Sequence, residues 1–297
     1  MNCFAIRELV TLTSRKVDGD RSNTPMIRKI LFPVDFSPSC VGMAAYVRQA
    51  AATFSAQVTI LHVCDLESHN GFELYVRPAG EILEEHWEIG RSKLDRFLRS
   101  EFPKETCPRV LLAGDASTLI VAAARKHEAD MIIMPTHAGR FRRMLLGSTT
   151  TKVLNEADCP VLTTQHAATI APRPVEHKVW LCGISLNSDS QRVLRLANHA
   201  ALQAGAKLAV VHVIPEFDLQ TRAEREQVER ERTSELHLGS DVSLLYGAVK
   251  EQLLKATRES SADVLVVGRK PSASGGTRIG RLTYPLIRES PCPVVSV

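Results

Sequence analysis

The residues best placed to do chemistry surround a glycine turn, Gly147-Ser148-Thr149, which follows a short apolar run at residues 131–134. Such a run is typical of a strand buried on both faces of a parallel sheet. A strand that leads through a glycine turn into a helix brings free backbone N–H groups and the positive end of the helix dipole to one point. This arrangement suits a phosphate group, so the stretch predicts a phosphate site. The alternative is a tight turn that only starts a helix.

The loop before this turn carries three arginines and a histidine, at Arg140, Arg142, Arg143 and His137. The arginines predict either further phosphate contacts or a solvated loop surface. His137 has no paired carboxylate or nucleophile around it, so we expect it to support the loop rather than to catalyse a reaction. No cluster of ligand residues predicts a bound metal. The pattern therefore indicates a binding site and not a catalytic centre.

The overall composition is that of a globular protein with two domains. The 297 residues are 44% hydrophobic and 24% charged, and the formal net charge is +4. No apolar run reaches the roughly 18 residues of a membrane span. The small charge does not require a nucleic-acid partner, and seven dispersed cysteines do not form a disulfide framework. We therefore expect a cytoplasmic protein that binds neither membrane nor nucleic acid.

The stretch around the glycine turn is repeated near the C-terminal end of the chain. An Ala-Asp pair, a glycine and a Cys-Pro-Val run occur within residues 129–161 and again, at one constant offset, within residues 262–294. In both copies apolar runs alternate with helical patterns, which predicts parallel strands joined by right-handed crossovers. The sequence therefore predicts an α/β fold built as a tandem repeat.

The repeat sets the expected domain boundaries. We expect the first domain at residues 27–168, a proline-containing linker at 169–177 and the second domain at 178–297. Residues 1–26 carry little pattern and predict a flexible N-terminal extension, with a true start at Met26 as the alternative. Residues 81–102 predict a long amphipathic helix whose buried side includes Leu94 and either Trp87 or Ile89.

Taken together, these features resemble the tandem two-domain form of the universal stress protein family over about residues 27–297. Each motif is weak alone and the ordered set is specific: Phe32-Pro33-Val34-Asp35-Phe36-Ser37, His62-Val63, Gly114-Asp115, Ala129-Asp130, Met134-Pro135-Thr136-His137, Leu146-Gly147-Ser148 and a Cys-Pro-Val run in each half. The resemblance implies two doubly wound parallel-sheet units, similar to the adenine nucleotide alpha-hydrolase-like folds. It also implies that their last strands pair, which makes an intramolecular pseudo-dimer.

Members of this family divide into ATP-binding and non-binding proteins. The ATP-binding members carry a glycine, two residues, a second glycine, nine residues and then Gly-Ser or Gly-Thr, because glycine lets the backbone approach the triphosphate. Here Pro135 and Ala138 stand at the first two glycines, and Gly139 follows. Gly147-Ser148 is kept, after a spacing one residue shorter than the family pattern. The ATP pattern is thus half kept.

Asp35 matches the family residue that contacts adenosine, and its alternative role is to cap the next helix or to accept from the backbone of Ser37. Carried over position by position, the resemblance implies ATP, with Mg²⁺ as its counter-ion. The residues expected to bind the nucleotide are Pro33, Val34, Asp35, Val63, Met134, Pro135, His137, Gly139, Gly147, Ser148 and Thr149, with Arg140, Arg142 and Arg143 as phosphate contacts.

The second unit has lost most of this pattern, since Ser185 and Arg281 replace Asp35 and Ser148. Two functions remain open. One is an ATP-binding module of stress response or signalling that binds nucleotide in the first domain only. The other is a scaffold or protein-interaction module of the same fold that binds no nucleotide. We expect at most trace ATP hydrolysis, and either the internal pair alone or a further homo-oligomer.

Overall fold

The computed structural model describes residues 27–64, 79–136, 146–165, 177–187, 189–215, 222–235, 242–271, 277–280 and 282–297. The expected N-terminal extension, most of the expected linker and the arginine-containing loop at residues 137–145 lie outside these ranges. Within them, strands and helices alternate along the chain, as the sequence pattern predicts.

The first unit contains five strands and four helices among its described residues. In chain order they are β1 Lys29–Pro33, α2 Pro38–Phe54, β2 Gln57–Cys64, α4 Ala79–Arg96, β3 Arg109–Ala113, α5 Ala116–Lys126, β4 Met131–Pro135, α6 Ser148–Glu156 and β5 Val161–Thr164.

The second unit repeats this order and adds a short hairpin, β10–β11, between its fourth long strand and its last helix. Its elements are β6 Val179–Ile184, α7 Ser190–Gln203, β7 Lys207–Ile214, α8 Arg222–Glu235, β8 Val242–Tyr246, α9 Val249–Glu259, β9 Val264–Val267, β10 Lys270–Pro271, β11 Thr277–Arg278, α10 Thr283–Glu289 and β12 Val294–Ser296.

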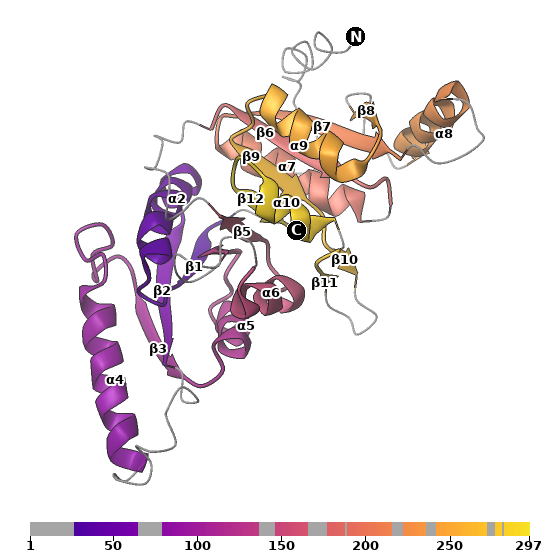
Figure 1. Cartoon of the computed structure of the whole chain (residues 1–297). Coiled ribbons are helices and arrows are strands. Elements are labelled where there is room, and N and C mark those ends of the chain that lie inside the picture. The colour runs from indigo at the N-terminus through magenta and orange to yellow at the C-terminus, as the bar shows by residue number, and fades with distance from the viewer. Residues whose placement is uncertain are drawn as a thin grey trace.

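Ten of these strands form one continuous sheet, in the order β3-β2-β1-β4-β5-β12-β9-β6-β7-β8 (Figure 1). Within this ten-stranded sheet every neighbouring pair of the same unit is parallel, and β5 and β12 are the one antiparallel pair. Each unit therefore has the doubly wound order expected of a crossover α/β fold. The predicted fold class is confirmed.

The two units meet through the pairing of β5 with β12. Val294 pairs with Thr163, Val295 with Leu162 and Ser296 with Val161. The repeat relates Val161 to Val294 and Thr163 to Ser296, so exchanging the two halves maps this set of pairs onto itself. The seam is thus an isologous contact with a pseudo-two-fold axis between Leu162 and Val295.

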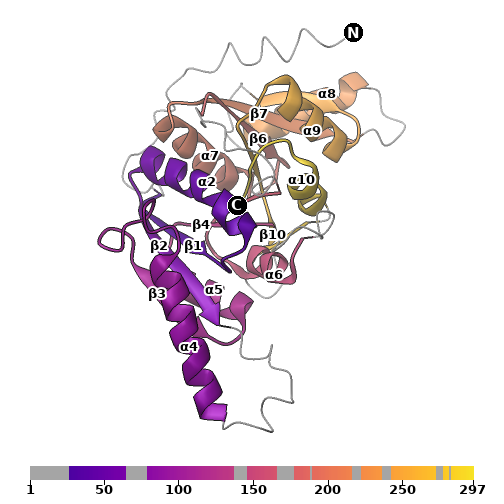
Figure 2. The same ribbon diagram turned by 60° about the vertical axis from the view of Figure 1, so that its left-hand side comes forward.

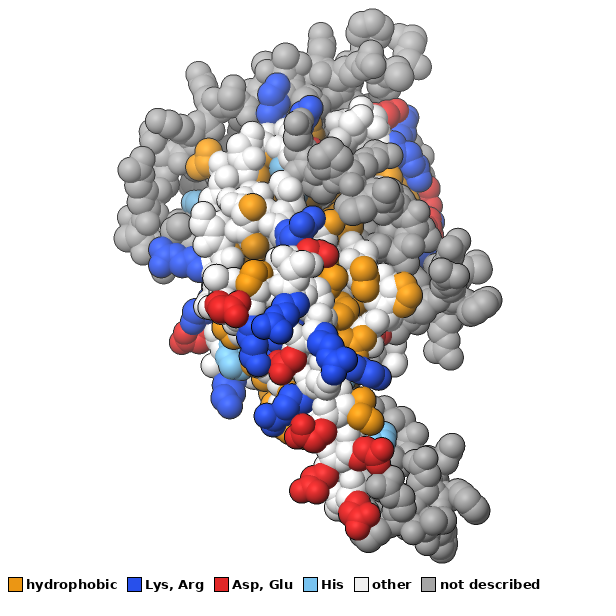
Figure 3. All heavy atoms as spheres, turned by 90° about the vertical axis from the view of Figure 1, so that its left-hand side faces the viewer, with side chains coloured by type: hydrophobic (Ala, Val, Ile, Leu, Met, Phe, Trp, Pro, Cys, Tyr) orange, Lys and Arg blue, Asp and Glu red, His pale blue; other side chains and the backbone are white. Residues whose placement is uncertain are grey.

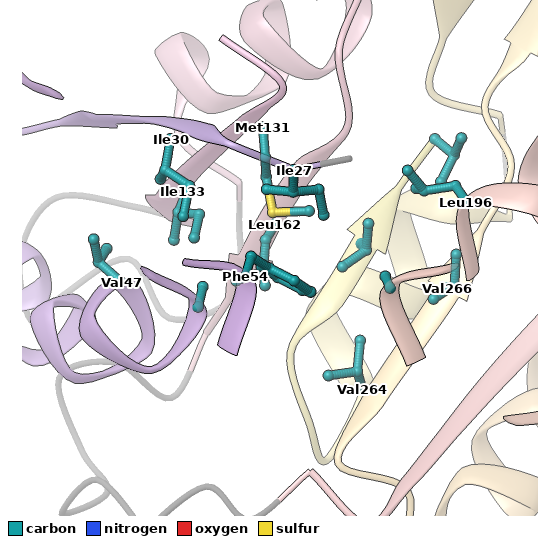
Figure 4. Packing of buried hydrophobic residues seen from close by; sticks show 14 of the residues in the cluster. Ile27, Ile30, Val47, Phe54, Met131, Ile133, Leu162, Leu196, Val264 and Val266 are labelled. Atoms are coloured by element: carbon teal, nitrogen blue, oxygen red, sulfur yellow. The ribbon is translucent and has the colours of Figure 1, made fainter. Parts of the chain in front are cut away.

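A hydrophobic core runs through both units on the side of the sheet that α2 and α7 cover. Ile30, Phe54 and Leu162 of the first unit belong to one buried cluster with Val264 and Val266 of the second (Figure 4). The Phe54 and Trp180 rings meet edge to face, with centroids 6.5 Å apart. In Figure 2, α2 and α7 lie side by side across the boundary, in agreement with their contacts. The two units therefore share a core instead of packing as separate bodies.

Helix α4 differs from its prediction, since it ends at Arg96 and not near residue 102. Leu98 has a left-handed backbone, with φ of 45°, which stops the helix. Leu94 is buried and Ile89 is 45% exposed, so the alternative in which Ile89 faces the sheet is wrong. Gly90 is the residue of α4 that approaches the sheet closely, because an added Cβ there would lie 2.7 Å from Cys64 Sγ.

Figure 3 shows acidic side chains grouped along the N-terminal part of α4, where negative charge stabilises the positive end of the helix dipole.

The seam supplies the first prediction. Leu162 is 7% exposed at the pseudo-two-fold axis, so Leu162→Asp places an unpaired carboxylate in the shared core. We expect a loss of about 3 kcal/mol or more in the free energy of unfolding, measured by urea denaturation. Leu202→Asp is the matched control, because Leu202 is 70% exposed. Equal effects of the two substitutions would contradict the shared-core description.

Candidate functional site

Helix α6 begins directly after the glycine turn, at the carboxyl end of β4. Gly147 is the N-cap residue and supplies no side-chain cap. The Gly147 N–H donates to the Thr136 carbonyl at 2.9 Å, and Thr150 Oγ1 donates to the Pro135 carbonyl at 3.1 Å. The first helical bond runs from the Thr151 N–H to the Gly147 carbonyl. The N–H groups of residues 148–150 therefore have no acceptor within the helix, as a phosphate site requires.

A pocket of about 260 Å³ lies between this helix end and the carboxyl ends of β1 and β4. β1 and β4 are neighbours in the sheet, and the chain leaves them toward opposite edges. That makes the place a topological switch point, where doubly wound sheets bind their ligands. The pocket is lined by Pro33, Val34, Asp35, Cys40, Leu61, Val63, Ala116, Ile120, Met134, Pro135, Gly147, Ser148, Thr149 and Thr150.

The structure brings most of the expected site residues together in this pocket. Pro33, Val34, Asp35, Val63, Met134, Pro135, Gly147, Ser148 and Thr149 all line it. The other five expected residues, His137, Gly139, Arg140, Arg142 and Arg143, lie outside the described part of the chain.

Sequence reasoning missed five lining residues: Cys40, Leu61, Ala116, Ile120 and Thr150. Four of these lie in the first or second turn of a helix that follows a strand of the first unit. Helices that follow parallel strands begin at the carboxyl edge of the sheet, where ligands bind. The position of these four residues just after a strand therefore indicates in the sequence that they lie near the site.

Asp35 already has structural partners. Its Oδ1 accepts from the Ser37 N–H at 2.9 Å and from the Cys40 thiol at 3.0 Å. Ser37 is in turn the N-cap of α2, since its hydroxyl accepts from the Cys40 N–H at 3.4 Å. Asp35 therefore has the role given as its alternative, since it accepts a hydrogen bond from the backbone of Ser37. Its Oδ2 has no hydrogen-bond partner among the described residues, so one oxygen remains for a ligand.

Cys40 is a poor nucleophile despite its place in the pocket. Burial, and then the neighbouring Asp35 carboxylate, raise the pKa of the Cys40 thiol far above its ordinary value. A thiol must ionise to attack or to bind a metal. Cys40 therefore contributes a small apolar wall and a weak donor to Asp35.

His62 connects two strand ends beside the pocket. A carbonyl only accepts, so the His62 Nδ1–H donates to the Val34 carbonyl, at 2.8 Å. His212 makes the same contact in the second unit, to the Ile184 carbonyl at 3.0 Å. Since both units keep this bond and only one keeps the pocket residues, His62 stabilises the fold. Burial lowers its pKa.

A charged pair flanks the pocket between α5 and α6. Asp115 is the N-cap of α5 and accepts from the Thr118 N–H and the Ser117 hydroxyl, each at 2.8 Å. Lys152, one turn after Ser148 on α6, approaches Asp115 Oδ2 to 3.2 Å. These bonds, led by Thr118, hold the pKa of Asp115 well below its usual range. Lys152 thereby places a positive charge near the start of α6.

The second unit keeps the turn and loses the site chemistry. Thr283 Oγ1 donates to the Gly268 carbonyl at 3.4 Å, as Thr150 does to the Pro135 carbonyl. Ser185 supplies no carboxylate at the end of β6, and Arg281 lies outside the described residues. The two units therefore share the hydrogen bond that joins the first turn of α6, or of α10, to the end of the preceding strand segment.

The described part of the chain contains no group of three or more His, Cys, Asp or Glu side chains placed to hold a metal ion. None of its helices is both long enough and apolar enough to cross a membrane.

Two doubly wound units that share one sheet define a tandem α/β protein with a pocket at a topological switch point. The particular family follows from a family model described as the universal stress protein family, which matches residues 26–165 and 177–297. The chain belongs to the universal stress protein family, and the resemblance seen in its motifs is confirmed.

Some similar proteins match the whole tandem chain and others match about half of it. A universal stress protein of Mycobacterium tuberculosis (strain H37Rv) is 22% identical over 286 residues, which cover 90% of this chain and 95% of that protein. One from Methanocaldococcus jannaschii is 28% identical over 152 residues, covering 49% of this chain and 86% of that protein. The crystal structure of a universal stress protein from Archaeoglobus fulgidus DSM 4304 matches with a TM-score of 0.66 at 20% identity, over 92% of this chain and 97% of that one. The structural likeness shows a common fold.

The site supplies a prediction about acid stability. Because the pKa of His62 is lowered in the folded protein, the unfolded chain binds more protons below its ordinary value of about 6.5. This contribution to stability is present above about pH 6.5 and is lost as the pH falls toward the lowered pKa. His62→Asn keeps a donor for the Val34 carbonyl and removes the titration. We expect the free energy of unfolding to fall less in this variant than in the wild type between about pH 7.5 and pH 5.

Urea denaturation at a series of pH values measures this difference. Parallel curves for the two proteins would contradict the assignment of a half-buried His62 that is neutral in the folded protein.

Proposed function

We propose that the first unit binds an adenine nucleotide, ATP in particular, in the pocket between β1, β4 and α6. The observation that supports this most is the convergence of nine residues carried over from the family pattern on one pocket at the switch point. Its volume, about 260 Å³, lies just below the range of about 300–1,000 Å³ of most ligand sites. That size suits the base and ribose, with the phosphates at the open start of α6.

The phosphate end of this proposed site is the N-terminus of α6. The N–H groups of residues 148–150 and the helix dipole favour an anion there. Lys152 adds a charge one turn further along the helix. Arg140, Arg142 and Arg143 belong to the proposal as additional phosphate contacts, and Mg²⁺ accompanies ATP as its counter-ion.

The adenosine end of the proposed site is apolar with one acceptor. Val34, Leu61, Val63 and Met134 line the pocket and suit the faces of a purine ring. Asp35 Oδ2 offers an acceptor for a donor group of adenosine, while Oδ1 stays bonded to Ser37 and Cys40. One carboxylate thus joins the ligand to the start of α2.

The chemistry of the pocket supports binding and not turnover. The described lining residues include no histidine, and the Cys40 thiol is held neutral. We therefore propose a cytoplasmic nucleotide-binding module of stress response or signalling, active as the internal pair or as a further oligomer. ATP hydrolysis would proceed at most at a trace rate.

A scaffold that binds no nucleotide is the second candidate, and one residue favours it. Pro135 stands where ATP-binding members have a glycine, and it has no N–H to give to a phosphate. An interaction protein of the same fold would keep the seam and the core and would not need the pocket.

The proposal predicts one nucleotide per chain, bound in the first unit. By isothermal titration with ATP and Mg²⁺, we expect a dissociation constant in the micromolar range or weaker, about −8 kcal/mol at best. Ser148→Arg fills the start of α6 and should abolish binding. Asp35→Asn keeps an acceptor for the Ser37 N–H, removes the charge and should weaken binding. Ser185→Asn is the matched control in the second unit and should bind as the wild type does.

Two sites of equal affinity, or full binding by Ser148→Arg, would contradict this assignment. No binding by the wild type, together with no nucleotide in protein purified without added ligand, would favour the scaffold.

A second prediction concerns turnover. Asp35 is the one carboxylate among the described lining residues and lies at the adenosine end of the proposed site. Because no described lining residue is placed as a base at the phosphate end, we expect the wild type to hydrolyse ATP well below about 1 per second, measured as phosphate release. A faster rate that a single side-chain change abolishes would overturn the binding-module proposal.

A further inference from the structure

Helix α6 belongs to the first unit but is contacted near both of its ends by the second. β11 packs against α6, and Figures 1 and 2 show the β10–β11 hairpin and α10 close to it. The start of the same helix lines the pocket and is the phosphate end of the proposed site. The contacts between the units therefore bear on the candidate site itself.

The C-terminal end of α6 is bound by a buried arginine of the second unit. Arg269 is 3% exposed. Its Nη1 donates to the carbonyls of Leu154 at 2.9 Å and Ala157 at 2.8 Å, and its Nη2 donates to the Cys159 carbonyl at 2.9 Å. Burial lowers its pKa to about 10, so the guanidinium is charged at neutral pH. A cation here satisfies carbonyls that the helix leaves free and opposes the negative end of its dipole.

Two further bonds join the second unit to this segment, one in the last turn of α6 and one just before the helix. Asn155 Oδ1 accepts from the Ile279 N–H at 2.8 Å, beside the hairpin. The Tyr284 hydroxyl, from α10, accepts from the Leu146 N–H at 3.3 Å. Leu146 directly precedes Gly147, which lines the pocket. The second unit thus bonds α6 in its last turn and directly after it, and bonds Leu146 just before its first residue.

The repeat places different side chains at the counterparts of the three residues that make these contacts. Thr136 is the counterpart of Arg269, and Thr151 is the counterpart of Tyr284. Arg288 is the counterpart of Asn155. Thr136 Oγ1 donates to the Thr164 carbonyl within its own unit. Arg288 pairs with the adjacent Glu289. Because a threonine stands at the counterpart of Arg269, the first unit has no guanidinium at that position to bind the carbonyls at the end of α10.

We infer that the second unit positions α6 for phosphate binding in the first, with Tyr284 and Arg269 as its positioning residues. This inference rests on the proposed function. Three N–H groups must meet the phosphate oxygens together, and sites of this kind tolerate displacements of only about 0.5 Å. A helix bound at both ends and packed in a dense core shifts little. The second unit, which has lost its own site residues, thereby acts on the affinity of the first.

Tyr284→Phe tests this role, because it removes only the hydroxyl that accepts from Leu146. Affinities for ATP with Mg²⁺ and for adenosine are measured separately by titration. We expect the dissociation constant of ATP to rise about fivefold, the effect of one neutral hydrogen bond, with that of adenosine unchanged. Tyr246→Phe is the matched control, since the Tyr246 hydroxyl bonds Glu226 inside the second unit. It should bind both ligands as the wild type does.

Arg269→Lys is the second variant, because lysine keeps the charge but cannot bond three carbonyls in the arginine geometry. We expect this variant to lose affinity for ATP and not for adenosine, and to lose more than Tyr284→Phe does. If the Arg269→Lys variant does not fold, the result for Tyr284→Phe alone decides the test. Unchanged ATP affinity in Tyr284→Phe, or equal losses of ATP and adenosine, overturns the positioning role and leaves the proposed function standing. Absence of binding by the wild type overturns both.

Discussion

The antiparallel pairing of β5 with β12 is the contact on which the rest of the molecule depends. Each unit ends in a short apolar strand, and an unpaired strand of this kind exposes a row of N–H and C=O groups. Pairing the two removes both edges at once, and Val161, Thr163, Val294 and Ser296 are 0–1% exposed as a result. The same pairing aligns the two cores and brings Arg269 to the carbonyls of the first unit. Because the partners belong to one chain, the contact does not weaken on dilution.

Comparison of the two units separates residues that serve the fold from residues that serve a ligand. Asp130 accepts from the Arg28 and Lys29 N–H groups, and Asp263 accepts from the Lys178 and Val179 N–H groups, in the same geometry. Phe36 and Leu186 share the same left-handed backbone after the first strand of each unit, with φ of 63° and 49°. These matched features need no ligand to explain them. Asp35 and Ser148 have no counterpart of their type in the second unit, and both line the pocket.

The fold could be predicted almost completely because apolar runs, glycines and a constant repeat offset all reflect local requirements of strands and turns. The pocket could be predicted in part, since strand ends such as Asp35 and the turn at Gly147 are visible in the order of motifs. Cys40 and Ile120 follow strand ends closely, which places them near the pocket edge, but which side chains of their helices face the pocket depends on how the helices pack on the sheet. Arg269 was beyond sequence reasoning for a further reason. An arginine after a strand is usually solvated, and its burial here depends on carbonyls more than 100 positions away in the chain.

The place of β12 has a consequence for synthesis on the ribosome. β5 occupies residues 161–164 and its partner residues 294–296, so the edge of the first half emerges well before the strand that covers it. At about 5–20 residues per second, that interval lasts roughly ten seconds. During this time the nascent first half carries an open apolar edge beside neighbouring chains. The edge is only four residues long, and short edges are one of the ways in which proteins limit sheet-to-sheet aggregation.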